Sequence, residues 1–100
     1  MTRRAGRTLR PTGELTVQTA AARAAVLTSA ATAGETLTLD LSRVSEMDTA
    51  GLQVVLVALA EARAAGGAAR IVSPSPAARD ALTLAGLSRL VDGTDQGADS

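Results

Sequence analysis

The most constraining feature of the sequence is a change of hydrophobic period near its middle. Leucine alternates with Thr and Asp from Thr36 to Leu41, which is the period of a strand. Between this run and the next pattern lies the tetrad Asp48-Thr49-Ala50-Gly51, and both Asp and Thr favour helix N-termini. The apolar residues that follow recur with helical spacing, at Leu52, Val55, Leu56, Leu59 and Ala62. The sequence therefore predicts that a strand leads, through a connector over residues 42–47, into a helix that begins near Thr49.

The rest of the chain alternates in the same way between apolar runs and helical patterns. The other predicted elements are a strand at Gly6–Arg10 ended by Pro11, a strand or its exit at Gly13–Leu15, a helix at Ala20–Ala31, a strand at Ala68–Val72, a helix from Pro76 to about Ala85 capped by Ser75, and a short strand or edge contact at Leu87, Leu90 and Val91. Such alternation is typical of an α/β sandwich with a parallel or mixed sheet. Right-handed crossovers place Asp48 at the carboxyl end of its strand, where α/β domains usually carry their sites.

Length and charge indicate one small domain. The 100 residues fit a single domain, which we expect to span residues 6–91 between a flexible N-terminal tail (1–5) and a flexible acidic tail (92–100). The longest apolar stretch, Leu52 to Ala60, is too short to span a bilayer, and no signal-like segment follows the first arginines. We therefore expect a cytoplasmic protein without a membrane span. The net charge of +0 does not favour nucleic-acid binding.

The charge is nevertheless unevenly distributed. Arginines at positions 3, 4, 7 and 10 precede the first acidic residue, Glu14. A solvated, partly disordered N-terminus is the simpler interpretation of this cluster, and binding of a phosphate-bearing partner is the alternative. An edge strand in this region could pair with the same strand of a second copy, but Pro11 weakens such pairing. We therefore expect a monomer or a weak homodimer.

Missing residue types exclude most catalytic chemistry. The chain contains no His, no Cys and no Lys, so it has no Ser/His/Asp or Cys/His arrangement and no thiolate or imidazole metal ligand. A phosphate loop of the Walker type requires Lys, and no GxGxxG motif is present. Glu46 and Asp48 are close in sequence, but no base is evident to work with them. We expect no enzyme activity, no cofactor and no metal.

Asp48 and Thr49 admit two interpretations. In the first, either side chain caps the helix, which stabilises it by about 1 kcal/mol, and Ala50-Gly51 lets the helix start pack closely on the sheet. In the second, the Thr49 hydroxyl is displayed at a helix N-terminus, where partial positive charge favours an anion. A phosphate on Thr49 brings about −1.5 to −2 charges next to Asp48, so a partner that fits the bare hydroxyl loses complementarity.

Several motifs together resemble one protein family. MDTAGL at residues 47–52 is similar to the switch loop of the STAS domain family, which includes bacterial anti-sigma-factor antagonists and the cytosolic domains of sulfate transporters. GEL at residues 13–15 resembles the family's GEL turn, SPSPA at 73–77 its last strand-to-helix turn, and LAGL at 84–87 its GL terminus. The resemblance extends from about Leu9 to Val91, in the family's order and spacing.

The resemblance implies a STAS-type αβ sandwich, with a mixed sheet of four to five strands and helices packed on it. It also implies an anti-sigma-factor antagonist. Such a protein binds an anti-sigma factor that is a GHKL-type serine kinase, frees the sigma factor, and is inactivated by phosphorylation of the residue after the loop Asp. In this sequence that phosphoacceptor is Thr49.

Two departures from the family pattern keep a second function open. Antagonists often carry Ser at the acceptor position and Ser or Thr after it, where this chain has Thr49-Ala50. They often carry Asp after GEL, where this chain has Thr16. These features are more similar to the STAS proteins of chemotaxis clusters and to the STAS subunit of lipid-transport ABC complexes. The alternative is therefore a non-phosphorylated interaction subunit, with a chemotaxis protein or a transporter ATPase as its partner.

We expect the partner to contact the loop and the outward side of the following helix. The candidate partner-binding residues are Asp48, Ala50, Gly51, Gln53, Val54, Val57 and Thr16. Val54 and Val57 form a modest apolar docking patch if they are exposed. A rotation of the helix or a neighbouring helix would instead bury them.

Overall fold

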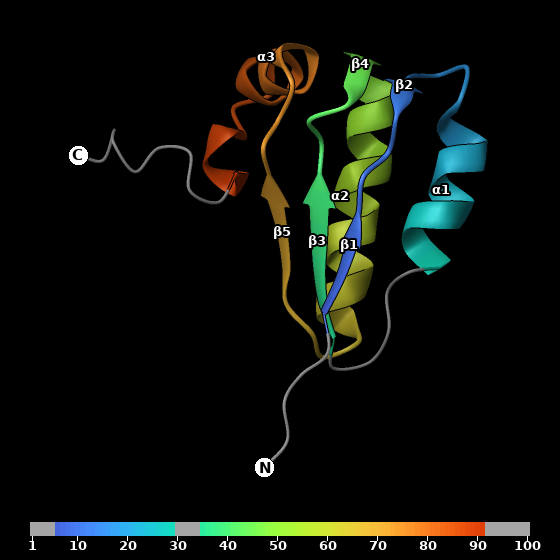
Figure 1. Cartoon of the computed structure of the whole chain (residues 1–100), viewed down its shortest axis with the longest axis vertical. Coiled ribbons are helices and arrows are strands. Elements are labelled where there is room, and N and C mark those ends of the chain that lie inside the picture. The colour runs from blue at the N-terminus through green and yellow to red at the C-terminus, as the bar shows by residue number, and fades with distance from the viewer. Residues whose placement is uncertain (1–5, 30–34, 92–100) are drawn as a thin grey trace.

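The computed structural model describes residues 6–29 and 35–91 of the chain (Figure 1). Its elements, in chain order, are β1 (Gly6–Leu9), β2 (Gly13–Leu15), α1 (Ala20–Ser29), β3 (Thr36–Asp40), β4 (Val44–Met47), α2 (Thr49–Ala64), β5 (Ala69–Val72), α3 (Pro76–Leu84) and a 3-10 turn at Ser88–Leu90. After this turn, Val91 forms a single parallel bridge with Ile71, which is the predicted edge contact. The predicted tails, at residues 1–5 and 92–100, lie outside the described residues.

All strand pairs in the described part of the chain are parallel. β1, β3 and β5 form one sheet with β3 in the middle, and β2 pairs with β4 in a second sheet. Figure 1 shows that β2 continues the path of β1 and that β4 continues the path of β3. The ladders are interrupted where Pro11 lacks an N–H group and where the Leu41 carbonyl accepts from Val44 N (3.3 Å) and Ser75 N (3.0 Å). The predicted α/β sandwich is confirmed, with its five strands in two parallel sheets instead of one mixed sheet.

Strand β4 corrects the predicted connector over residues 42–47. Gly13 N donates to the Arg43 carbonyl (3.0 Å) and Asp48 N donates to the Leu15 carbonyl (3.2 Å), so β2 holds both ends of β4. Burial along β4 does not alternate, because Val44 is buried while Ser45 and Glu46 are both exposed. Residues 44–47 therefore form a strand because they pair with β2, which is distant in sequence, and not because their own apolar residues alternate. The pairing fixes Asp48 at the carboxyl end of β4, where the sequence predicted a site, and we call this end of the fold the rim.

Helix α2 is the central helix of the fold. It packs on β3 and β5, α1 lies beside it, and α3 packs against β4 (Figure 1). Its buried residues are Gly51, Leu52, Val54, Val55, Ala58, Leu59 and Ala62. The predicted stripe is therefore present, except that Leu56 is only half-buried. It is also wider than predicted, because α1 packs along one side of α2. Val54 is only 8% exposed, so its predicted place in a surface patch is wrong, whereas Val57 is 50% exposed as expected.

The core is entirely aliphatic and lies between the sheet and the helices. Fully buried leucines come from β2, β3 and all three helices, and Ile71 comes from β5. The largest of these side chains are Leu15, Leu27, Leu37, Leu39, Leu41, Leu59, Ile71 and Leu82. Without aromatic side chains to fill space, the elements must approach closely to reach native packing density.

Gly51 marks the closest such approach near the rim. It lies in the first turn of α2, and a Cβ atom at this position would overlap the carbonyl oxygen and carbon of Leu15 in β2. The obstructing atoms belong to the backbone, so no side-chain rotation relieves the overlap. Gly51 therefore permits the close packing of helix and sheet that the sequence suggested.

Replacing Gly51 by Ala tests this contact. Overpacking costs about 1–3 kcal/mol, and the upper part of this range applies because the obstructing atoms belong to the backbone. Ala gains roughly 1 kcal/mol over Gly in a helix, so we expect Gly51→Ala to lower the free energy of unfolding by about 1–2 kcal/mol in urea titrations. Gly6→Ala is the matched control, because its Cβ would meet only Thr36 O at 3.8 Å. Equal stability of the two variants would contradict the close approach.

Candidate functional site

Asp48 connects three segments at the carboxyl end of β4. Its backbone is extended, and its Oδ1 accepts a hydrogen bond from Gly51 N (3.0 Å), which makes Asp48 the N-cap of α2. Its Oδ2 accepts from Val17 N (2.9 Å), in the turn that joins β2 to α1. Of the two residues predicted as possible caps, Asp48 is the one that caps. Its carboxylate also holds the β2–α1 turn against the start of α2.

These hydrogen bonds favour the ionised form of Asp48. The backbone N–H of Gly51, followed by that of Val17, lowers the pKa of the Asp48 carboxyl below its ordinary value of 3.8. The side chain therefore carries a negative charge throughout the neutral pH range. A fixed charge thus stands immediately before Thr49 in the chain.

The β2–α1 turn is held by its own hydroxyl groups. Thr16 Oγ1 donates to Glu14 Oε1 (3.3 Å) and accepts from Gln18 N (3.3 Å), while Thr19 Oγ1 donates to the Glu14 carbonyl (2.9 Å). Thr16 is only 8% exposed. Its hydroxyl is therefore engaged inside the turn, where it holds the backbone of Gln18 and the side chain of Glu14.

Thr49 lies at the surface on the first turn of α2. Its side chain is exposed, and its hydroxyl makes no hydrogen bond with any other described residue. Gln53 and Val57 follow at one-turn intervals, and both are exposed, so the three residues form a strip along the outer side of α2. Thr49 is therefore an accessible hydroxyl at the positive end of a helix.

The structure brings together some of the predicted partner-binding residues and separates others. Asp48 and Ala50 are half-buried at the rim, beside the exposed strip of Thr49, Gln53 and Val57. The remaining three, Gly51, Val54 and Thr16, are buried. Gly51 and Thr16 act on the shape of the rim through packing and hydrogen bonds, and Val54 belongs to the core.

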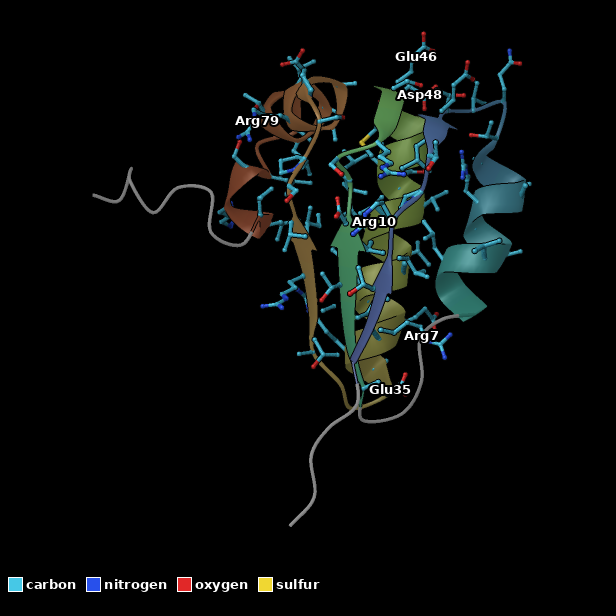
Figure 2. All side chains as sticks on the ribbon, in the orientation of Figure 1. Arg7, Arg10, Glu35, Glu46, Asp48 and Arg79 are labelled. Atoms are coloured by element: carbon cyan, nitrogen blue, oxygen red, sulfur yellow. The ribbon has the colours of Figure 1, made fainter. Side chains whose placement is uncertain are left out.

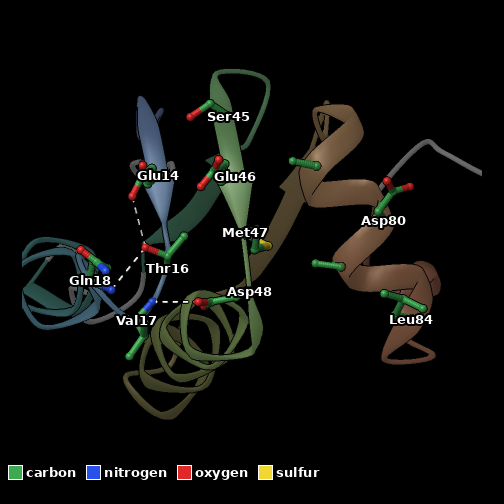
Figure 3. Close-up of a pocket in the computed structure, with 12 residues that line it drawn as sticks. Glu14, Thr16, Val17, Gln18, Ser45, Glu46, Met47, Asp48, Asp80 and Leu84 are labelled. Atoms are coloured by element: carbon green, nitrogen blue, oxygen red, sulfur yellow. Dashed lines mark hydrogen bonds between the residues drawn. The ribbon is translucent and has the colours of Figure 1, made fainter.

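Two adjoining hollows open at this end of the molecule. The larger, which we call the β4–α3 groove, has a volume of about 700 Å³ and is lined by the β2–α1 turn, β4 and α3 (Figure 3). The smaller, which we call the Thr49 hollow, has a volume of about 280 Å³ and includes Thr49, Leu52 and Ala85. Met47, Asp48, Ala81 and Leu84 line both. The accessible hydroxyl thus lies in a hollow next to a larger groove.

Sequence reasoning missed the residues that give the β4–α3 groove its character. Val17 and Leu84 flank it and are 70% and 89% exposed, and the carboxyl groups of Glu46 and Asp80 also line it. Leu84 lies off the buried side of α3, which is formed by Ala78 and Leu82. The only local signal in the sequence is that Leu84 falls outside the apolar stripe of its helix. That signal does not show which other element the side chain faces.

Two further properties concern the described residues, 6–29 and 35–91. They contain no group of three or more acidic side chains placed to hold a metal ion. None of their helices has the length and apolar character needed to cross a lipid bilayer.

The sequence matches the family model of the STAS domain over residues 2–98. The chain belongs to the STAS domain family. This confirms the family that the motifs around residues 13–15, 47–52, 73–77 and 84–87 indicated. No curated protein sequence matches this STAS chain at a significant level.

Solved structures with the same fold include two forms of an anti-sigma factor antagonist. The unphosphorylated form of the antagonist SpoIIAA is similar at 28% identity and a TM-score of 0.70, covering 99% of this chain and 89% of that one. The phosphorylated form of SpoIIAA, a Bacillus cell fate determinant, is similar at 26% identity and a TM-score of 0.58, covering 99% and 93%. A protein from Thermotoga maritima, described as a candidate antagonist, has 24% identity and a TM-score of 0.69, covering 94% and 85%, and supports the fold alone.

The double role of Asp48 in this STAS domain is open to a direct test. Asn and Ser cap helices as well as Asp does, but Asn offers one acceptor oxygen and Ser is too short to reach Val17 N as well. We expect Asp48→Asn and Asp48→Ser to lower Tm at pH 7, whereas Asp80→Asn, which removes the same charge from an exposed site, leaves Tm unchanged.

The pH dependence of this effect follows from the lowered pKa of Asp48. Because the folded-state pKa lies below the unfolded value, the stabilisation is complete above about pH 4 and is lost as the pH falls through the folded pKa. The Tm difference between wild type and Asp48→Asn should therefore shrink on acidification below about pH 4. A difference that stays constant down to pH 2 would contradict the role of the ionised carboxylate.

Proposed function

We propose that this STAS domain is an anti-sigma-factor antagonist that is switched by phosphorylation of Thr49. The observation that carries the proposal is the exposed Thr49 hydroxyl, free of hydrogen bonds to the described residues, beside the fixed Asp48. Similarity to the unphosphorylated and phosphorylated forms of SpoIIAA supports the proposal at the level of the family. The partner is an anti-sigma factor with serine/threonine kinase activity, and binding it releases the sigma factor.

The chemistry asks little of this chain beyond display of the hydroxyl. The γ-phosphoryl group of ATP, bound by the kinase, is transferred to Thr49 Oγ1, the bond to the ADP oxygen breaks, and the hydroxyl proton passes to a base of the kinase. Regulatory phosphorylation requires that the acceptor reach the kinase, and the first turn of α2 meets that requirement. The domain itself is a substrate and a binding protein, not an enzyme.

The surroundings of Thr49 explain how a phosphate would switch binding off. Most side chains of the Thr49 hollow are apolar, among them Met47, Leu52 and Leu84. A partner that covers this hollow would have to remove water from the phosphate, and burying an uncompensated charge is costly. Asp48 is already bound to two amides, so it cannot move away from the new charge. Both effects oppose the complex that the bare hydroxyl permits.

The phosphorylation test uses ATP and the GHKL-type kinase encoded in the same genome. Intact-mass spectrometry should show addition of one phosphoryl group to wild type and to Thr49→Ser, and none to Thr49→Ala. Thr83→Ala, which removes an exposed hydroxyl from α3, is the control and should be labelled like wild type. If Thr49→Ala is labelled as efficiently as wild type, Thr49 is not the acceptor.

A second candidate function is a constitutive interaction subunit of a chemotaxis complex or a lipid-transport ABC complex. The observation that favours it is Thr16, which stands where antagonists often have Asp and whose hydroxyl is used inside the turn. In this case the partner covers Thr49 without ever modifying it.

This alternative predicts that the partner binds the domain without ATP and that Thr49 carries no phosphate afterwards. Thr49→Glu would place an unpaired charge in the interface and weaken the complex about tenfold or more, since the cost exceeds about 1.4 kcal/mol. Thr83→Glu serves as the control in a titration calorimetry experiment with the purified chemotaxis protein or transporter ATPase. Partners that bind Thr49→Glu and wild type equally would exclude a contact at Thr49.

A further inference from the structure

The β4–α3 groove is flanked by two apolar side chains that the fold does not use. Val17, in the β2–α1 turn, and Leu84, at the end of α3, are 70% and 89% exposed, and they are the two most exposed large hydrophobic side chains among the described residues. Both line the same groove, of about 700 Å³ (Figure 3). Such side chains beside a concave surface are typical of a protein-binding site.

The charge of the groove limits what fits between these side chains. Its lining includes the carboxyl groups of Glu14, Glu46, Asp48 and Asp80 and no basic side chain. The carboxylates of Glu14 and Asp48 accept hydrogen bonds within the rim. The carboxylates of Glu46 and Asp80 accept no hydrogen bond from any other described residue. Figure 2 shows Glu46 and Asp48 together at this end of the molecule. An occupant must therefore bring positive charge, which disfavours nucleic acids, phosphate groups and anionic membranes.

We propose that the β4–α3 groove is a docking site for a partner segment that presents an apolar side chain flanked by Arg or Lys. The apolar residue packs between Val17 and Leu84, and the cations lie against Glu46 and Asp80. The proposal rests on the proposed function in one respect, namely that this partner is the protein that reaches Thr49. Complementary charge in such a groove mainly raises the association rate and selects the partner.

The docking site is adjacent to the switch but separate from it. Thr49 lines the Thr49 hollow and is absent from the lining of the β4–α3 groove, while Leu84 belongs to both. One partner surface can therefore seat a basic segment in the groove and cover Thr49 with a neighbouring segment. A phosphate on Thr49 opposes the second contact and leaves the first in place.

The test uses a designed probe, so that no kinase is involved. The probe is a fluorescein-labelled helical peptide with a stripe of leucine flanked by arginine, and its control carries glutamate at every arginine position. Fluorescence anisotropy with the full chain should show binding of the arginine peptide only. Burying one leucine side chain is worth more than about 1.4 kcal/mol, so Leu84→Ser should raise Kd about tenfold.

Matched variants separate the groove from the rest of the surface. Val17→Ser should also weaken binding of the arginine peptide, whereas Val26→Ser, which changes a valine that is 60% exposed on α1, should leave Kd unchanged. Glu46→Gln combined with Asp80→Asn should slow association at low salt, and the difference from wild type should vanish near 1 M salt, where charges are screened beyond about 3 Å. Thr49→Glu, whose added negative charge lies next to the acidic groove, should not weaken binding of the arginine peptide.

Several outcomes would overturn the proposal. Equal affinities of Leu84→Ser, Val26→Ser and wild type would place the binding elsewhere, and equal binding of the glutamate peptide would remove the role of charge. Sedimentation that shows a dimer dissociated by Leu84→Ser would make a second copy of the chain the occupant. Failure of Thr49 labelling by the kinase would refute the switch while leaving these peptide measurements unaffected, so the two proposals can fail independently.

Discussion

The carboxylate of Asp48 is the interaction on which the rim depends. It accepts from Gly51 N at the start of α2 and from Val17 N in the β2–α1 turn, while the backbone N–H of the same residue donates to the Leu15 carbonyl. Three chain segments meet at one residue because Gly51, having no Cβ, lets α2 approach Leu15 directly. The start of α2 is consequently fixed relative to β2 and to the β2–α1 turn. Thr49 and Val17 take their positions from this corner.

A fixed corner makes the neighbouring surface usable for recognition. Side chains that recognise a partner lose less conformational entropy when their backbone is already ordered. Around Asp48 the fold exposes a free hydroxyl, a strip along α2 and two apolar side chains on opposite sides of a groove. None of these groups is needed to hold the domain together, because the core is formed by buried leucines on the other side of the same elements. The core and the proposed recognition surface thus lie on different faces of the same short segments.

What the sequence predicted well was decided by local interactions. The caps at Asp48 and Ser75 each depend on a hydrogen bond to an amide three residues ahead, at 3.0 and 3.1 Å, and residue type alone reports such contacts. The stripe on α2 and the alternation in β3 are likewise visible within one turn or a few residues. The family motifs added the order of elements, while their assignment of Thr49 as the phosphoacceptor stays a prediction.

What the sequence did not predict was decided by tertiary contacts. β4 forms because β2 supplies its hydrogen bonds, although its own residues show no strand period. Val54 is buried because α1 packs beside α2, and the amphipathic pattern of α2 carries no information about that neighbour. The groove depends on the placement of α3 beside β4 and opposite Val17, across sequence-distant segments. Such features become evident only when the elements are assembled.

Charge near the rim also constrains how a phosphate on Thr49 could act. The groove next to Thr49 is already acidic, so a cationic partner would be attracted more strongly from a distance after phosphorylation. Long-range repulsion therefore cannot be the mechanism that ends the complex. The opposing effect must be local, from the size of the phosphate and the cost of removing its water against Met47, Leu52 and Leu84. A switch of this kind would shorten the lifetime of the complex while preserving the rate of encounter, so a domain phosphorylated on Thr49 would still meet its partner quickly and leave it quickly.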